Sequence, residues 1–307
     1  MKTKECIENY QRSSEEAFRV PDIGKGFIPQ GITYDAERKC FLITGYMMYG
    51  GASPIYVIDV ATKQCVKTVR MAHPNGKRFR GHAGGLSLYQ GSVYIAGSTK
   101  SCMYRYDLKD IYNAPDKSRV SYRDVVMLRS ENDYYRVSWT STDDELLYAG
   151  EFYRKGPLFY TAASHKIAVD QNTEFGGLMI GFTLEDNKPV PKVAYSLCNN
   201  AQGACFHDGK LYLSVAYGYR PSHIRTYDLK SLPQSGTIRI LETEVPLYIL
   251  GGGAEEIIKE ISPMSEEIVI VDRKMYIVSE YASNIYLLGK LRKANRIYAT
   301  DITWFSE

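Results

Sequence analysis

The sequence predicts an all-β fold, a five-bladed β-propeller with four-stranded antiparallel blades, and three observations support it. Five segments share one plan, in which a small or polar pair precedes an apolar strand, a turn and a second strand. A third strand pattern follows each segment, and a fourth follows most of them. Aligned positions in the five segments recur every 54 or 64 residues, and they are Gly31, Gly85, Trp139, Gly203 and Glu267.

The five segments read as inner hairpins, because a turn-forming sequence separates two apolar runs in each of them. The fourth contains Asp208-Gly209, a pair that favours a tight turn between alternating strands. The predicted hairpins cover residues 29–46, 82–98, 137–153, 201–218 and 265–282.

The outer strands follow each hairpin in order. Third strands are expected over 54–62, 102–110, 178–186, 223–231 and 296–304. Fourth strands are expected over 65–71, 121–128, 188–197 and 255–261. Aspartates recur at the ends of the third strands, and we interpret them as turn residues whose side chains bond nearby backbone amides.

The ring is expected to close at the N-terminus. The last unit lacks a fourth strand before the chain ends at Glu307, and residues 15–23 can supply it. This pairing removes an open sheet edge. We therefore predict an N-terminal extension over 1–14 and a single propeller domain over 15–307.

Three insertions interrupt the repeat, at 154–177, 230–253 and 283–295. Loops of this length in a compact domain are usually functional or disordered. Gly251–Gly253 lies in the second insertion, and it lacks the Lys-Ser/Thr pair and the helix of a phosphate-binding loop. We interpret these glycines as a flexible loop tip.

Composition limits the partners. The 38 Lys and Arg residues nearly balance 35 Asp and Glu residues, so a net charge of +3 gives no reason to expect nucleic-acid binding. The sequence contains no apolar stretch long enough for a membrane span. The six cysteines show no metal-binding spacing, which favours free thiols and a reducing compartment. We expect a monomer, cytoplasmic for the chain as given and secreted if its start has been processed or replaced.

Polar residues converge on one face of the predicted propeller. First strands begin, and second strands end, on the same face because the two are antiparallel. The first strands open with Gln30, His82, Ser138, Gln202 and Glu266. The second strands end with Tyr46, Ser98, Glu151, Tyr217 and Glu280. The insertions add Arg154, His165 and Lys290 as candidate lid residues.

Several functions fit this ring of residues, and the sequence leaves them open. In the structural interpretation, glutamine and glycine bond backbone and water in a narrow channel. In the binding interpretation, a small polar ligand such as a sugar or a peptide end occupies the channel mouth. The residues assigned to that ligand are Gln30, Tyr46, Ser98, Arg154, Gln202 and Tyr217. A third interpretation is a protein-interaction scaffold whose insertions form the contact surface.

Catalysis and metal binding are the remaining alternatives. As an enzyme, a hydrolase or lyase, the protein would use His82 as general acid or base with Glu151 or Glu280. No nucleophile motif accompanies these residues. Glu266 with the amide oxygens of Gln30 and Gln202 offers the oxygen ligands that Ca²⁺ or Mg²⁺ accepts, without a contiguous metal loop.

The hairpin phrases carry a resemblance. "GFIPQGITYD", "GHAGGLSLYQGSVYIAG", "ELLYAGEFY", "AQGACFHDGKLYLSVAYG" and "PMSEEIVIVDRKMYIVSEYAS" resemble a family of uncharacterised bacterial β-propeller proteins, commonly described as hypothetical or secreted. More distantly, they are similar to propellers of the gluconolactonase, strictosidine synthase and virginiamycin lyase kinds. That similarity implies a metal ion and acid–base residues at the channel mouth. This chain has Glu and Gln where the metal-binding lactonases have a set of Glu, Asn, Asn and Asp.

Overall fold

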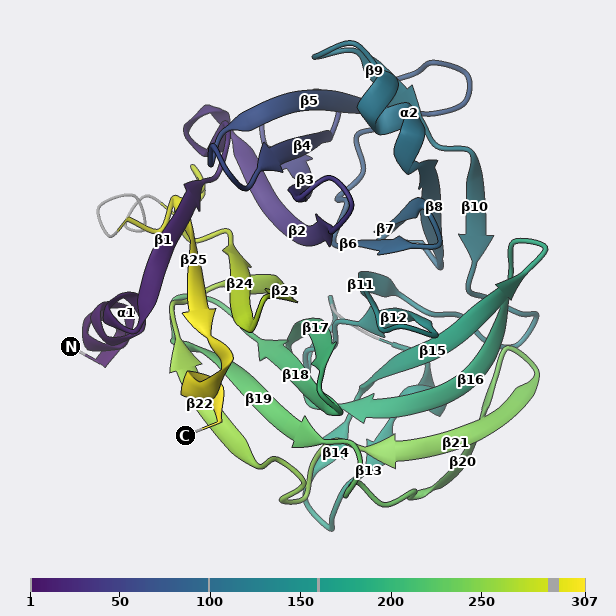
Figure 1. Cartoon of the computed structure of the whole chain (residues 1–307). Helices are drawn as coiled ribbons and strands as arrows, with labels where there is room; N and C mark the ends of the chain where they lie inside the picture. Colours follow the sequence, from purple (N-terminus) through teal and green to yellow (C-terminus); the bar gives the residue numbers. More distant parts are fainter. Residues whose placement is uncertain (1, 99, 159–160, 287–292, 307) are drawn as a thin grey trace.

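Five sheets surround a central axis, with the first strand of each sheet innermost (Figure 1). The computed structural model describes residues 2–98, 100–158, 161–286 and 293–306. The sheets are the blades of a propeller, so the predicted five-bladed architecture is confirmed. None of the helices within these residues is long and apolar enough to cross a membrane.

The first two blades contain the strands that the hairpin repeat predicts. Blade 1 is formed by β2 (Phe27–Asp35), β3 (Cys40–Met47), β4 (Pro54–Asp59), β5 (Cys65–Ala72) and β9 (Arg119–Ser121). Blade 2 is formed by β6 (Leu86–Tyr89), β7 (Ser92–Ala96), β8 (Cys102–Asp107) and β10 (Asp124–Met127), with α2 (Leu108–Asn113) after β8. The single strand expected over 121–128 is divided, because the chain first adds β9 to blade 1 in parallel with β5.

The remaining blades follow the same plan. Blade 3 is formed by β11 (Val137–Thr142), β12 (Leu147–Glu151), β15 (Gly177–Glu185) and β16 (Lys188–Leu197), extended by β21 (Thr243–Ile249) and β20 (Gly236–Ile240). Blade 4 is formed by β17 (Ala201–His207), β18 (Lys210–Val215), β19 (Ser222–Asp228) and β22 (Ile257–Ile261). Blade 5 is formed by β23 (Ser265–Val271), β24 (Lys274–Ser279), β25 (Arg296–Asp301) and β1 (Ser14–Arg19).

The N-terminal strand closes the ring as expected. β1 pairs antiparallel with β25, from Ser14 opposite Thr300 to Arg19 opposite Arg296. The preceding helix α1 (Lys2–Arg12) buries Ile7 and Tyr10. β25 is therefore paired on both sides, and β1 becomes the outermost strand of blade 5.

The second insertion is a β-hairpin where the sequence suggested a functional or disordered loop. β20 and β21 pair antiparallel, and β21 lies parallel to β16 of blade 3. Ile240, Val245 and Leu247 are buried against the blade 2–blade 3 core. Apolar residues on one face of this hairpin explain why it folds back onto the sheet.

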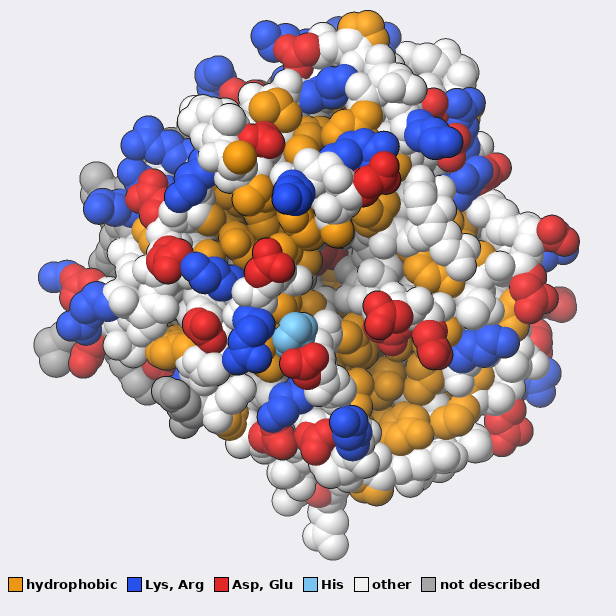
Figure 2. All heavy atoms as spheres, viewed as in Figure 1, with side chains coloured by type: hydrophobic (Ala, Val, Ile, Leu, Met, Phe, Trp, Pro, Cys, Tyr) orange, Lys and Arg blue, Asp and Glu red, His pale blue; other side chains and the backbone are white. Residues whose placement is uncertain are grey.

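The hydrophobic core is divided into five clusters, and each cluster fills the space between two neighbouring blades. This arrangement leaves the polar starts of the inner strands on the axis. The face shown in Figure 2 carries mixed charges, with Lys and Arg side chains interspersed among Asp and Glu and hydrophobic side chains between them. This mixture agrees with the small net charge.

Asp59, Asp228 and Asp301 bond nearby backbone amides as inferred from the sequence, whereas Asp107 forms ion pairs with Arg105 and Arg123 instead. Asp59 accepts hydrogen bonds from the backbone N–H and the hydroxyl of Thr62, at 2.7 and 2.6 Å. Asp301 accepts the same pair from Thr303. The six cysteines are all free thiols, and only Cys65 is exposed.

Candidate functional site

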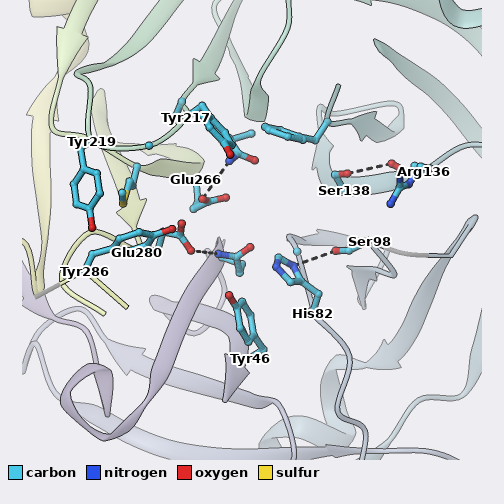
Figure 3. Close-up of a pocket in the computed structure, with 17 residues that line it drawn as sticks. Tyr46, His82, Ser98, Arg136, Ser138, Tyr217, Tyr219, Glu266, Glu280 and Tyr286 are labelled. Carbon is cyan, nitrogen blue, oxygen red and sulfur yellow. Dashed lines mark hydrogen bonds between the residues drawn. The ribbon is translucent and has the colours of Figure 1, made fainter. Parts of the chain in front are cut away.

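A cavity of about 540 Å³ opens where the sequence placed the channel mouth. It contains most of the residues that the sequence brought together, and Figure 3 shows their arrangement. The predicted residues that line it are Gln30, Tyr46, His82, Ser98, Ser138, Gln202, Tyr217, Glu266 and Glu280. Glu151 and Arg154 are not part of its lining.

β-Bulges present the inner-strand residues to this cavity. The register between the first and second strands shifts at Gln30 in blade 1 and at Gln202 in blade 4. Blade 3 shifts at Ser138, and blade 5 shifts across Glu266 and Glu267. A bulge inserts an extra residue and redirects its side chain out of the regular alternation. The same irregularity, repeated in four blades, therefore produces the polar ring.

The glycines of the repeat allow the inner strands to converge. A side chain at Gly31 would begin 2.8 Å from the backbone nitrogen of Leu86. One at Gly203 would begin 2.7 Å from the Cα atom of Glu267. In the Gln-Gly pair the glycine therefore permits close packing, while the glutamine faces the site.

Glu266 and Glu280 form an acidic side of the cavity, each hydrogen-bonded to a glutamine. Gln30 Nε2 donates to Glu280 Oε2 at 3.2 Å, and Gln202 Nε2 donates to Glu266 Oε1 at 3.3 Å. The hydroxyl of Tyr286 also hydrogen-bonds Glu280. These contacts hold both carboxyl groups at the cavity wall (Figure 3).

Burial raises the pKa of both acids. The pKa of Glu280 rises to about 7, even though its hydrogen bonds to Tyr286 and Gln30 oppose the change. The pKa of Glu266 lies well above its ordinary value, first because the side chain is buried and then because Glu280 and Glu267 carry like charge. A positive charge bound beside these two neighbouring carboxyl groups would favour their ionised forms.

Glu267 follows Glu266 in β23, does not line the cavity and is only 2% exposed. Its Oε2 accepts hydrogen bonds from the backbone N–H of Ile32 at 2.8 Å and of Leu86 at 3.0 Å. These two residues belong to the inner strands of blades 1 and 2. Glu267 thus connects three blades, and its role is structural.

His82 lines the cavity, but it is not the residue of blade 2 that corresponds to Gln30 in the repeat. Gly85 aligns with Gly31, so Gly84 is the counterpart of Gln30, and it also lines the cavity. The His82 ring reaches the site from two residues further back. It stacks on Tyr46 at a centroid distance of 4.5 Å, and its Nδ1 lies 3.4 Å from the hydroxyl of Ser98. The ring has a water-accessible edge, and partial desolvation by the cavity walls lowers its pKa, so it is neutral at pH 7.

Glu151 does not face the cavity, contrary to the expectation that it assists catalysis. Side chains alternate along a strand, and it is the next residue, Phe152, that lines the cavity. The buried Glu151 carboxylate accepts hydrogen bonds from the backbone N–H groups of Arg136 and Leu178. Its Oε2 also lies 2.8 Å from His165 Nδ1. Glu151 therefore anchors the chain around blade 3.

His165 is part of an internal clasp and does not lie over the site as a lid residue. It is 1% exposed, and its Nε2 lies 3.0 Å from Asp133 Oδ1. Burial lowers its pKa, but the hydrogen bonds to Asp133 and Glu151 outweigh burial and raise the pKa to about 9. The protonated ring joins the first insertion to blade 3 between two carboxylates.

Arg154 is exposed beside the cavity. Its guanidinium lies 4.0 Å above the ring centroid of Tyr217, and it donates a hydrogen bond to the same tyrosine hydroxyl. It therefore supports one cavity wall without lining the cavity. Lys290, the other candidate lid residue, lies outside the described residues.

Sequence reasoning missed several lining residues. They are Arg136, Phe152, Tyr219, Met264 and Tyr286. Phe152 lies within the predicted hairpin 137–153, next to Glu151, and Tyr219 lies one residue beyond the predicted hairpin 201–218. Arg136 and Tyr286 come from irregular segments in which no repeat position marks them.

The proposed metal ligands are arranged less favourably for a cation. The side-chain nitrogens of Gln30 and Gln202 face the carboxylates, so these groups already pair with one another. In the part of the chain that the structure describes, no group of three or more His, Cys, Asp or Glu side chains is placed to hold a metal ion.

Fold and site together define a class: a five-bladed β-propeller with a polar, tyrosine-walled cavity at one channel mouth. No protein-family model matches the chain, and no curated protein matches it. Among solved structures, Myxococcus xanthus glutaminyl cyclase aligns with 93% of this chain and 94% of its own, at 8% identity and a TM-score of 0.47. Kuenenia stuttgartiensis hydrazine synthase aligns with 86% of this chain and 67% of its own, at 10% identity and a TM-score of 0.39. Likenesses of this size say nothing about activity.

Proposed function

We propose that the protein binds a small polar ligand carrying a protonated amine, such as an amino sugar or a peptide N-terminus, at the channel mouth. The observation that carries this proposal is the pair Glu266 and Glu280, two carboxyl groups on one wall of a tyrosine-lined cavity. A bound ammonium group would supply the missing positive charge, so both acids would ionise.

The other walls of the cavity support the same ligand class. Tyr46, Tyr217 and Tyr286 line the cavity, and aromatic side chains attract cations and pack against sugar or peptide groups. Arg136 lies across the cavity from the acidic side (Figure 3). Its cationic side chain suits a hydroxyl or carboxylate oxygen at the other end of the ligand. A cavity of about 540 Å³ is within the range of small-molecule sites.

Binding of matched amine and amide probes tests the proposal by calorimetry. Glucosamine and Ala-Ala amide are expected to bind at pH 7, where their amines are mostly protonated, and their N-acetylated forms to bind at least about tenfold more weakly because the charge is lost. Glu280→Gln and Glu266→Gln should reduce amine binding by about tenfold or more, and Glu185→Gln, at an exposed site on blade 3, should leave it unchanged. Equal binding of the acetylated probes would refute the amine assignment. A thermal shift with Ca²⁺ that EDTA reverses would assign the acids to a divalent cation.

The pH dependence of the same binding provides an independent check. A group whose pKa is about 7 in the free protein must lose its proton when a cation binds beside it. Affinity should therefore increase by up to about tenfold per pH unit as pH rises toward 7, and it should fall again above about pH 8 as the amine of the probe loses its proton. Calorimetry in two buffers of different ionisation enthalpy should detect proton release at pH 6.5 in the wild type and less in Glu280→Gln.

A second candidate is acid–base catalysis on the bound ligand, a hydrolase or lyase reaction. One observation favours it: neutral His82 and Glu280, with its pKa raised to about 7, line the same cavity. The pKa of Glu280 lies near neutral pH, which suits a general acid or base, and the neutral His82 ring, with its pKa lowered to about 4, can accept or relay a proton beside it. Once a substrate is found, His82→Ala should reduce turnover by about a hundredfold or more while changing the free energy of unfolding by less than about 1 kcal/mol. A large loss of stability with no specific loss of turnover would assign His82 to the scaffold.

A further inference from the structure

A second cavity, of about 350 Å³, lies at the outer edge of blade 1. Its lining includes four cationic side chains, Arg70, Arg78, Lys117 and Arg119. The other described residues that line it are Met47, Gly50, Gly51 and Ala52, so its lining includes no acidic side chain. The cavity is therefore a concentrated positive site in a protein of nearly balanced charge.

An unusual strand brings these cations together. β9 lies between α2 and β10 in the sequence, but it pairs with β5 at the outer edge of blade 1 (Figure 1). This pairing places Arg119 directly opposite Arg70. Like charges in directly opposed positions destabilise a sheet. Arg78 comes from the loop after β5, and Lys117 from the turn before β9. Three separate segments thus place positive charge at one point, at a cost in stability that a bound anion would offset.

Nearby groups offset only part of the charge of these side chains. Arg119 Nη1 donates to the carbonyl oxygen of Gly76 at 3.2 Å, which leaves its charge intact. Lys117 Nζ lies 3.7 Å from the Asp116 carboxylate. Asp22 interacts electrostatically with Arg70, but it also forms an ion pair with Lys25 at 3.0 Å. An excess of positive charge therefore remains around the cavity.

We propose that this cavity binds a phosphate group, as the free ion or on a small phosphorylated molecule. Arginine offers a planar fork of donors that matches phosphate oxygens, and three arginines surround this cavity. Four cations suit the double charge of phosphate better than the single charge of a carboxylate. The cavity volume accommodates a phosphate with a small organic group.

Titration with inorganic phosphate and with glycerol 3-phosphate tests this site, using the whole protein at constant ionic strength. Saturable binding and a rise in melting temperature are expected with both probes. Arg78→Gln and Lys117→Gln change exposed side chains outside the strands and should weaken phosphate binding about tenfold each. Lys192→Gln removes one exposed charge on blade 3 and serves as the matched control.

Each result bears directly on the proposal. Weaker phosphate binding in Arg78→Gln and Lys117→Gln, with normal binding in Lys192→Gln, supports a phosphate site. Binding of glycerol 3-phosphate in strong preference to inorganic phosphate supports it and assigns the source to a phosphorylated molecule. Equal weakening in all three variants would mean general charge screening and would overturn it. Absence of saturable binding by either probe, or binding only of a long polyanion, would also overturn it.

Discussion

Glu267→Ala is expected to lower the free energy of unfolding by about 2 to 6 kcal/mol, because it leaves two buried N–H groups without an acceptor. Those groups belong to Ile32 and Leu86, on the inner strands of blades 1 and 2. Chemical denaturation followed by circular dichroism measures the change.

Glu267→Gln is the matched variant, since its amide oxygen can accept the same two hydrogen bonds. It should cost less than about 1 kcal/mol, because it retains both acceptor contacts and removes a buried charge. Burial raises the pKa of Glu267 well above its ordinary value despite the backbone hydrogen bonds. Ionisation above the unfolded-state pKa therefore opposes folding, and the wild type should gain stability relative to Glu267→Gln as pH falls. Equal losses in the alanine and glutamine variants would contradict the proposed bridging role.

His165→Ala is expected to destabilise the protein by about 3 to 5 kcal/mol at pH 6, because it leaves two carboxylates without their shared counter-charge. The ring lies 2.8 Å from Glu151 and 3.0 Å from Asp133. The first insertion should also become susceptible to limited proteolysis, because the clasp holds it against blade 3. His165→Asn retains a hydrogen-bond donor near the position of Nδ1, so it should keep the contact with Glu151. Its free energy of unfolding should lie between those of the wild type and His165→Ala.

The pH dependence of this effect has a definite sign. The pKa of His165 rises from 6.5 to about 9 in the folded protein, so protonation stabilises the fold. This contribution, about 3 kcal/mol, is fully present below pH 6.5 and is lost as pH rises through 9. The difference in unfolding free energy between wild type and His165→Ala should therefore shrink over that window. Lys166→Ala, at the exposed neighbouring position, should behave as wild type. A difference that is constant with pH would exclude the charged clasp.

The blade plan was predictable because it depends on local chemistry. Turn pairs such as Asp208-Gly209 mark hairpins, and alternating apolar residues mark strands with buried faces. The number of repeats predicted the number of blades. The N-terminal strand, which belongs to no repeat, predicted how the last blade is completed. The cavity residues Gln30, Tyr46, Gln202, Glu266 and Glu280 followed from the antiparallel geometry of each hairpin.

Other features depended on contacts between distant segments. The hairpin β20–β21 looked like an irregular insertion, since the sheet that it joins precedes it by about forty residues. Glu151 lies at a repeat position but faces away from the cavity, because the alternation of the strand assigns the inward direction to Phe152. Arg119 reaches Arg70 only because β9 crosses back to blade 1.

The sequence by itself determined that this protein is a five-bladed propeller closed by its N-terminal strand, with polar residues at one channel mouth. The periodicity of apolar residues and turns repeats in every blade, so this much can be read along the chain. Only the tertiary structure decided which polar side chain enters the cavity, which forms the clasp and which bridges the blades. The physical reason is that β-bulges and crossovers determine side-chain direction and long-range contact, and neither follows from the local pattern.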